Sequence, residues 1–286
     1  MEDVFTVVRQ EHNALMRSPK VLGEWARNLE AIEALAFDQG GKWKSFLNQP
    51  VILQSMFMNA QGKLLQNQLE FVLRTIPMEH LELCLPEPEI GNPPVVSIGD
   101  FSVSHNTVHH LYHIARFART KGFEVLSSSK TFVEWGGGYG NFARLIKTIN
   151  PNATYTIIDL PIFSLIQFRY LSEVLGEDKV TFLEKGEQPV EGTINLLPST
   201  YWEETELAAD FIVATWALSE SPIEVQERVY ASSFFGASHG LFGFHQCGYH
   251  IPFMKESISL HKKLEQSGYE FSDVRVVPGK NFYAFK

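Results

Sequence analysis

The sequence predicts a doubly wound α/β fold, with a mostly parallel sheet between layers of helices, preceded by an α-helical N-terminal region. From residue 131 onward, short β-like runs alternate with helical segments, which is the pattern of a parallel sheet. In 21–37 and 50–76, apolar residues recur at helical spacing. The last two β-like runs, 271–277 and 281–286, flank a Pro-Gly turn and predict a hairpin that adds an antiparallel edge to the sheet.

A two-part organisation follows from the stretch between these regions. Residues 85–100 contain four prolines and two glycines, which is typical of a connector. We therefore expect a helical region with its connector over residues 1–100 and an α/β domain over residues 101–286. The N-terminal helices are suited either to cover the domain as a cap or to hold two copies together as a homodimer.

The elements of the second part can be assigned from their periodicity. Helical segments are expected over 103–122, 141–149, 161–176, 222–236 and 254–268. Strands are expected over 131–135, 153–159, 179–184, 209–218 and 240–246.

Composition and charge exclude several classes of partner. The formal net charge is −9 and no basic run is present, so binding to a nucleic acid is not expected. The sequence has no apolar run of membrane-spanning length and no secretory signal, so no membrane partner is expected either. Its two cysteines, Cys84 and Cys247, are far apart and predict reduced thiols, which suggests a cytoplasmic protein.

The glycine-rich stretch TFVEWGGGYGNFARL is the strongest candidate for a binding site. It joins a predicted strand to a predicted helix, where missing Cβ atoms and free helix N–H groups let a ligand approach the backbone. The spacing is acid-x-G-x-G-x-G, starting at Glu134, and it departs from the dinucleotide pattern G-x-G-x-x-G because Asn141 stands at the third glycine position. A second acid, Asp159, ends the next strand and is placed to accept hydrogen bonds from ribose hydroxyls.

These motifs carry a family resemblance. The run from Glu134 to Asn141, EWGGGYGN, followed by IIDLP over 157–161, resembles the class I S-adenosylmethionine-dependent methyltransferases. The motifs W-G-G-G-Y-G and D-L-P more narrowly resemble those of the sugar O-methyltransferase group. The resemblance covers residues 105–286. It implies a Rossmann-like methyltransferase sheet with an antiparallel C-terminal strand, S-adenosyl-L-methionine as the cofactor, and O-methylation of a sugar-containing small molecule.

The resemblance also implies which residues hold the cofactor. The glycine loop would pack against its methionine part, and the acid after the second strand would hold its ribose. Carried over, the cofactor-binding residues are Glu134, Gly136, Gly137, Gly138, Tyr139, Gly140, Asp159, Leu160 and Trp216. The alternatives are a nicotinamide-dependent dehydrogenase, a loop rich in glycine for packing only, and a non-catalytic relative of the methyltransferases.

Methyl transfer to a sugar hydroxyl requires a general base, because the hydroxyl pKa is far above neutral. His245, after the fifth strand of the α/β region, is the first candidate, and a structural histidine is the alternative. Glu220 is a second candidate, as a base or as the group that orients one. Its neighbourhood is also typical of a helix start, with Ser221 as the cap and Pro222 at the first helical position. Trp216 is suited to the methionine end of the cofactor or to the core.

A histidine stripe lies on the predicted helix before the glycine loop. His105, His109 and His113 are four residues apart and share one helical face. No acidic cluster joins them, so we expect them to line a polar pocket or a solvated face, and no metal site is predicted. His105 is placed near the helix start to reach a substrate. The match of 236–240 to the hydrolase pattern G-x-S-x-G is rejected because it falls between a helix and a strand instead of between a strand and a helix.

Overall fold

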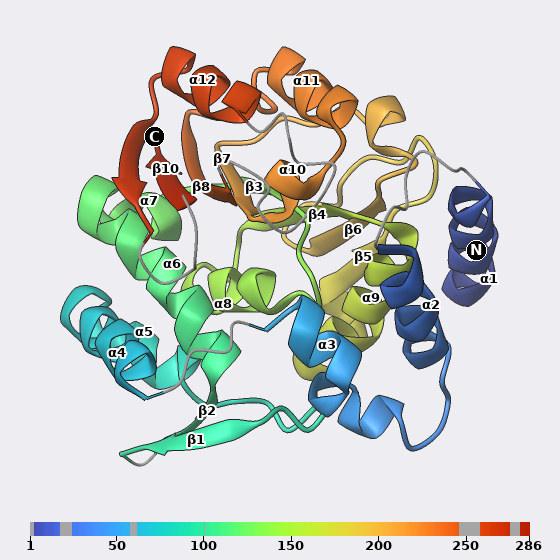
Figure 1. The fold of residues 1–286 in the computed structure, drawn as a ribbon, viewed down its shortest axis with the longest axis horizontal. Helices are drawn as coiled ribbons and strands as arrows, with labels where there is room; N and C mark the ends of the chain where they lie inside the picture. The colour runs from blue at the N-terminus through green and yellow to red at the C-terminus, as the bar shows by residue number, and fades with distance from the viewer. Residues whose placement is uncertain (1–2, 18–24, 58–61, 100, 246–257, 275–280) are drawn as a thin grey trace.

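The computed structural model describes residues 3–17, 25–57, 62–99, 101–245, 258–274 and 281–286. A central sheet has the strand order β5-β6-β4-β3-β7-β8-β10-β9 and helices on both faces (Figure 1). Its strands are β3 (Thr131–Trp135), β4 (Thr154–Asp159), β5 (Val180–Phe182), β6 (Ile194–Pro198), β7 (Phe211–Thr215), β8 (His239–His245), β9 (Glu270–Asp273) and β10 (Asn281–Phe285). The predicted α/β class is confirmed.

The last two strands form the antiparallel edge of the sheet, with β9 outermost and β10 beside β8. The strands from β5 to β8 pair in parallel, and β10 runs antiparallel between β8 and β9. In β10, Tyr283, Ala284 and Phe285 are all buried, whereas both ends of β9 are exposed. Burial on both faces suits a strand that is paired along both edges. The antiparallel edge expected from the last two strands is therefore confirmed, whereas the Pro-Gly turn proposed between them lies outside the described residues.

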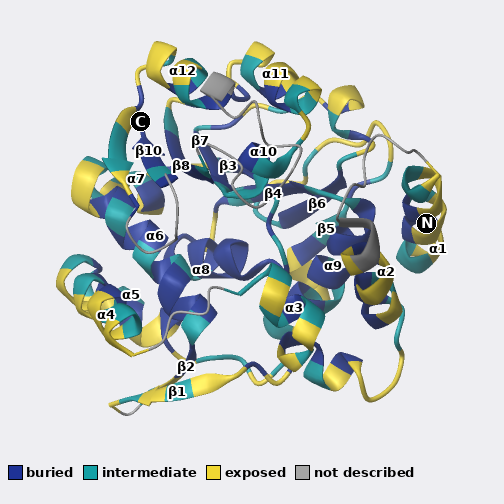
Figure 2. Ribbon diagram, viewed as in Figure 1, coloured by how far each residue is buried: buried dark blue, intermediate teal, exposed yellow. Residues whose placement is uncertain are grey.

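The two faces of the sheet are covered by different helices. The helices α6 (His105–Lys121), α8 (Asn141–Ile149) and α9 (Pro161–Leu175) pack on one face, with α7 (Phe123–Ser128) beside them. The helices α11 (Ile223–Ala231) and α12 (Ile258–Gln266) pack on the other. Neighbouring strand residues such as Ile157 and Ile158 enter opposite apolar clusters, as the period of two requires. Figure 2 shows the sheet buried between helices whose outer faces are exposed.

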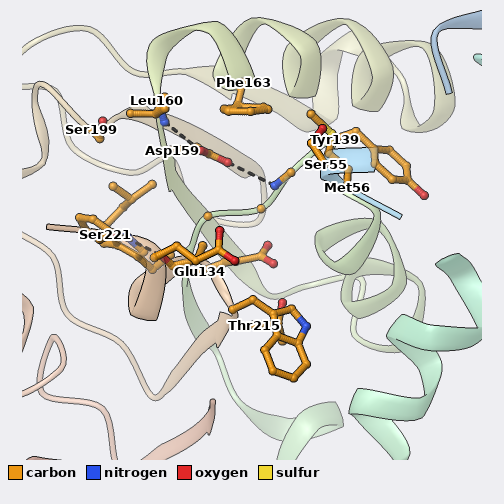
Figure 3. A pocket seen from close by; sticks show the side chains of 18 of the residues that line it. Ser55, Met56, Glu134, Tyr139, Asp159, Leu160, Phe163, Ser199, Thr215 and Ser221 are labelled. Carbon is orange, nitrogen blue, oxygen red and sulfur yellow. Dashed lines mark hydrogen bonds between the residues drawn. The ribbon is translucent and has the colours of Figure 1, made fainter. Parts of the chain in front are cut away.

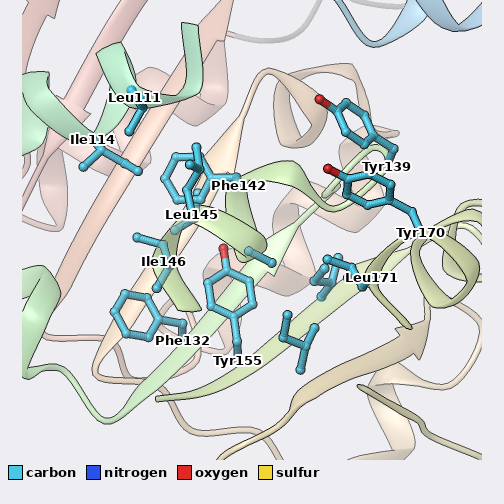
Figure 4. Packing of buried hydrophobic residues seen from close by; sticks show 14 of the residues in the cluster. Leu111, Ile114, Phe132, Tyr139, Phe142, Leu145, Ile146, Tyr155, Tyr170 and Leu171 are labelled. Atoms are coloured by element: carbon cyan, nitrogen blue, oxygen red, sulfur yellow. The ribbon is translucent and has the colours of Figure 1, made fainter. Parts of the chain in front are cut away.

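Helix α8 fills the space between α6 and the sheet. Its Phe142 and Ile146 lie between Leu111 of α6 and the strand residues Phe132 and Tyr155 (Figure 4). This packing fixes the N-terminal end of α8, and with it the glycine turn that leads into the helix.

The N-terminal region is largely helical, and it packs on the face that carries α9 and α6. It comprises α1 (Val4–Met16), α2 (Trp25–Ala36), the 3-10 helix η1 (Trp43–Asn48), α3 (Pro50–Ser55), α4 (Lys63–Thr75) and α5 (Met78–Cys84). Both α1 and α2 pack against α9, and α4 packs against α6. The helical run expected over 50–76 is split, because α3 ends at Ser55 and α4 begins only after Gly62, whose φ is +57°.

Several elements depart from the sequence prediction. A hairpin begins with β1 (Val95–Ile98) in the expected connector and ends with β2 (Phe101–Ser104), which takes the first residues of the helix expected over 103–122. Strand β6 was missed. The strand expected over 209–218 ends at Thr215, and α10 (Ala217–Glu220) follows. Short 3-10 helices occur at η2 (Glu177–Lys179) and η3 (Trp202–Glu204).

Two further predictions concern the cysteines and the membrane. Cys84 is buried as a free thiol, whereas Cys247 lies outside the described residues. Within the described part of the chain, no helix is long and apolar enough to cross a bilayer.

Candidate functional site

A cavity of about 730 Å³ lies at the carboxyl ends of the central parallel strands, where ligands bind in open α/β sheets. Its walls come from the segments that follow β3, β4, β7 and β8 and from helix α6. The N-terminal region supplies a further wall through Leu15, Leu29 and the segment 54–57. Figure 3 shows Ser55 and Met56 of this wall beside Tyr139 of the glycine turn.

The glycines of the turn have different tasks. A Cβ on Gly136 would lie 2.1 Å from Ala217 Cβ, and one on Gly137 would lie 2.6 Å from Ile157 Cγ2, so close packing requires both. Gly140 caps α8 with φ of +96°, packs against a leucine of α9, and does not line the cavity. At Gly138, with φ of +57°, the nearest atom to an added Cβ is 3.9 Å away. Gly138 is thus the position where a missing side chain leaves backbone open to a ligand.

Asp159 is held at the end of β4 by hydrogen bonds to the turn. Its Oδ1 accepts from Leu160 N at 2.8 Å, and its Oδ2 accepts from Gly138 N at 3.2 Å (Figure 3). Gln167 of α9 donates to the same Oδ2 at 2.9 Å and also to the Gly138 carbonyl at 2.9 Å. Burial raises the pKa of Asp159 to about 7 despite these donors. Asp159 is half-buried at the cavity wall, and its hydrogen bonds fix the orientation of the carboxyl group.

Glu134 lies beneath the turn and lines the cavity. Its side chain is 1% exposed, and its Oε2 accepts a hydrogen bond from Tyr155 Oη at 3.0 Å. Burial raises the pKa of Glu134 to about 8, since the Tyr155 bond opposes this shift only in part and the nearby Asp159 adds to it. A buried acid of this kind gains from a cationic ligand that stabilises its charged form.

His245 and Glu220 meet at the cavity wall beside Trp216. His245 Nε2 lies 3.7 Å from Glu220 Oε1, and its Nδ1 lies 2.5 Å from Asn281 Oδ1. Burial lowers the pKa of His245, but the interactions with Glu220 and Asn281 outweigh it and raise the pKa above its ordinary value. The imidazole packs on the Trp216 indole with ring centroids 5.0 Å apart. Trp216 has φ of +73°, an uncommon backbone conformation that is concentrated at functional sites.

The expected helix start after Glu220 was wrong in detail. Helix α11 begins at Ile223, with Pro222 at the cap position and no side-chain cap bond. The Ser221 hydroxyl instead accepts from Trp135 Nε1 at 3.0 Å and donates to the Ala217 carbonyl. Because Ser221 has tertiary partners, it does not cap the helix.

Only part of the histidine stripe on α6 lines the cavity. His109, His110 and His113 line the cavity, and burial lowers the pKa of each, whereas His105 does not line it. His109 Nδ1 lies 3.1 Å from Gln68 Nε2, and His113 Nδ1 lies 2.5 Å from Tyr283 Oη. Within the described ranges, no group of three or more His, Cys, Asp or Glu side chains is placed to hold a metal ion.

The residues fit the cofactor that the sequence resemblance implies. An open backbone at Gly138, the fixed carboxyl of Asp159 and the buried acid Glu134 offer partners to the methionine, ribose and amino groups of S-adenosylmethionine, respectively. Leu160, Tyr139 and Trp216 add apolar surface to the same cavity. Several polar lining residues, among them Ser199, Thr200 and Thr215, are not predictable from the sequence because no motif marks them.

Comparisons with known proteins give remote structural similarities. No family model and no curated protein matches the chain. Among solved structures, PigF with S-adenosylhomocysteine is 12% identical, with 63% of this chain and 57% of that chain covered and a TM-score of 0.41. The chain thus spans less than two thirds of PigF.

Two further solved structures show the same level of similarity. Magnesium protoporphyrin IX methyltransferase from Synechocystis PCC 6803 with bound S-adenosylmethionine is 11% identical, with 80% of this chain and 100% of that chain covered and a TM-score of 0.43. The mitomycin 7-O-methyltransferase MmcR is 13% identical, with 90% of this chain and 74% of that chain covered and a TM-score of 0.41. At these identities and TM-scores the similarities carry no functional conclusion.

Proposed function

We propose that the chain is an S-adenosylmethionine-dependent methyltransferase that methylates a hydroxyl group of a small molecule. The observation that carries this proposal is that one cavity joins two sets of groups. Gly138, Glu134 and Asp159 form a site suited to the cofactor, and His245 with Glu220 forms a site suited to proton removal. Either set alone would be weak support.

The sheet supports this reading over a nicotinamide-dependent dehydrogenase. A dinucleotide-binding sheet is built from two parallel halves in the order 3-2-1-4-5-6. Here the antiparallel β10 is inserted between β8 and β9, as the resemblance to methyltransferases implies. The third glycine of the dinucleotide pattern is also absent, because Asn141 occupies that position.

The hydrogen bonds of His245 suit a general base. If Nδ1 donates to the Asn281 carbonyl oxygen, the neutral ring keeps its lone pair on Nε2, on the side of Glu220. The negative charge of Glu220 then stabilises the imidazolium that forms when Nε2 takes the hydroxyl proton. The bound cofactor supplies an electrophilic methyl group on a sulfonium. Trp216 packs against the base, and the N-terminal region supplies a wall of the same cavity.

The acceptor is inferred from the motifs. The W-G-G-G-Y-G and D-L-P runs favour a sugar or a glycosyl-containing molecule, and another small natural product, such as a phenol or a polyketide, is the alternative. A non-catalytic binding protein with this fold is the alternative from another class. The lining residues of segment 54–57 support a cap role for the N-terminal region, and a homodimer through the same helices stays a proposal.

Methyl transfer from S-adenosylmethionine with a labelled methyl group tests the function. We would offer free sugars, nucleotide sugars and phenols as acceptors and identify labelled products by mass spectrometry. A labelled product from the wild type, with turnover reduced in His245→Gln, supports the proposal. A protein that binds the cofactor but methylates none of a broad acceptor panel would favour the non-catalytic alternative.

A further inference from the structure

Two buried side chains determine the hydrogen position on His110. Arg144 Nε donates to Asn141 Oδ1 at 2.8 Å, and a guanidinium can only donate. The amide oxygen of Asn141 therefore faces Arg144, and its Nδ2 faces Thr107 Oγ1 at 3.2 Å and His110 Nδ1 at 3.2 Å. Since Nδ2 is also only a donor, His110 Nδ1 must carry a lone pair. The hydrogen of the neutral ring is then on Nε2.

His110 is a neutral hydrogen-bond donor at the cavity wall. Burial, together with the neighbouring His109 and Arg144, lowers its pKa to about 3, so the ring does not take up a second proton near neutral pH. The side chain is half-buried and lines the cavity, and none of the described residues accepts a hydrogen bond from Nε2. A donor without a partner at a cavity wall requires an acceptor from water or a ligand.

The charges around the cavity leave one ligand group without a partner. The proposed cofactor ends in an amino acid and so carries a carboxylate. Among the described lining residues, Arg228 is the only lysine or arginine; its side chain is 52% exposed and pairs with Glu203. The acids of the wall, Glu134 and Asp159 among them, repel a carboxylate when they are ionised, and His245, whose pKa is raised, is paired with Glu220. Neutral N–H donors are therefore the remaining partners for the carboxylate.

His110 lies where a donor to the cofactor carboxylate is required. It contacts Asn141, which directly follows Gly140, so it stands beside the end of the glycine turn that would hold the methionine part. The Nε2 atoms of His109 and His113, both buried without a described partner, lie in the same wall, with the two ring centroids 4.2 Å apart.

We propose that His110 Nε2–H donates a hydrogen bond to the carboxylate of the cofactor's amino-acid part, with Asn141 as the residue that positions the hydrogen. This inference rests on the proposed function. It adds a cofactor-binding residue outside the glycine motif, on the helix before it. It also gives the buried Arg144–Asn141 pair a role in ligand recognition.

The test compares two ligands that differ only in the carboxylate. S-adenosylhomocysteine and its decarboxylated analogue are titrated calorimetrically into the wild type, His110→Phe, His110→Gln and the control Thr120→Val, which changes an exposed residue of the same helix outside the cavity. We expect His110→Phe to weaken S-adenosylhomocysteine binding by about 10-fold, the usual effect of one hydrogen bond to a charged group, and to leave the analogue unchanged. His110→Gln retains a donor and should recover part of the difference, and Thr120→Val should change the affinity for neither ligand.

Asn141→Asp provides a separate test of the hydrogen position. A carboxylate at this site still accepts from Arg144 but also accepts from His110 Nδ1, so the ring hydrogen moves from Nε2 to Nδ1. The ¹⁵N chemical shifts of the imidazole should report this exchange, and the preference for S-adenosylhomocysteine over the analogue should fall with the ring intact.

The outcomes separate this inference from the proposed function. Equal weakening of both ligands by His110→Phe, or no effect on either, would overturn the carboxylate contact while the cofactor assignment stands. A wild type that binds neither ligand would instead refute the proposed function. A lone pair on Nε2 of the wild-type protein would overturn the hydrogen assignment.

Discussion

Glu134 makes the stability of the ligand-free protein depend on pH in an unusual direction. Burial raises the pKa of its carboxyl from an ordinary 4.5 to about 8 in the folded state. The folded protein therefore binds a proton that the unfolded chain has already released. Stability from this group is fully present below the unfolded pKa and is lost as the pH rises through about 8. We expect the free energy of unfolding to fall between pH 6 and pH 8.

The size of this loss follows from the two pKa values. For a group whose pKa is 4.5 in the unfolded chain and about 8 in the folded protein, the free energy of unfolding falls by about 2 kcal/mol between pH 6 and pH 8. Glutamine has nearly the same shape, keeps an oxygen for the Tyr155 hydroxyl, and does not titrate. Over this pH range, the free energy of unfolding of Glu134→Gln should therefore fall by about 2 kcal/mol less than that of the wild type.

Urea unfolding followed by tryptophan fluorescence at pH 6, 7 and 8 measures the difference. The control is Glu265→Gln, which changes an exposed glutamate on α12 and should follow the wild type. If Glu134→Gln and the wild type lose stability in parallel, Glu134 is not held as a neutral acid and the argument from its burial fails.

Three further substitutions test single parts of the site. Asp159→Ala should weaken S-adenosylhomocysteine binding by at least about 10-fold, because the ribose loses a carboxylate partner. Calorimetry measures this affinity, with Asp178→Ala, a change at an exposed residue, as the control. Unchanged affinity would refute the ribose assignment. His245→Gln should reduce turnover by about 10²-fold or more while cofactor affinity stays near the wild-type value, and unchanged turnover would place the base elsewhere. Gly138→Ala should cost about 1 kcal/mol of stability because of its positive φ, and its methyl group should weaken cofactor binding by entering the open space of the cavity. Gly136→Ala should lower the stability measured by urea unfolding more strongly, because its methyl group would meet the packed Ala217 side chain. The reverse order of stabilities would contradict the roles given to the two glycines.

The parts of the site that the sequence predicted are those encoded locally. Glu134, the glycine turn and Asp159 belong to two strand ends, and the strand–turn–helix pattern places them without knowledge of the rest of the chain. Parallel pairing of β3 with β4 then brings the two acids to the same edge of the sheet. The proximity of Glu220 and His245 follows in the same way, from two neighbouring strands with parallel pairing.

The parts that the sequence did not predict depend on tertiary contacts. Gln167 and Asn281 hold Asp159 and His245 through side-chain geometry that no spacing rule reveals. The lining residues of segment 54–57 reach the cavity only because the N-terminal helices pack on α9 and α6. Strand β6 was missed because it ends in Pro198, a residue that argues against a strand.

Calorimetric titration of the protein with S-adenosylhomocysteine, with NAD as the control ligand, tests the assignment of the glycine turn most directly. The site described above predicts one-to-one binding of S-adenosylhomocysteine and no binding of NAD. Binding of NAD alone would replace the methyltransferase reading with a dinucleotide-binding one. The absence of binding by either ligand would contradict the cofactor assignment altogether.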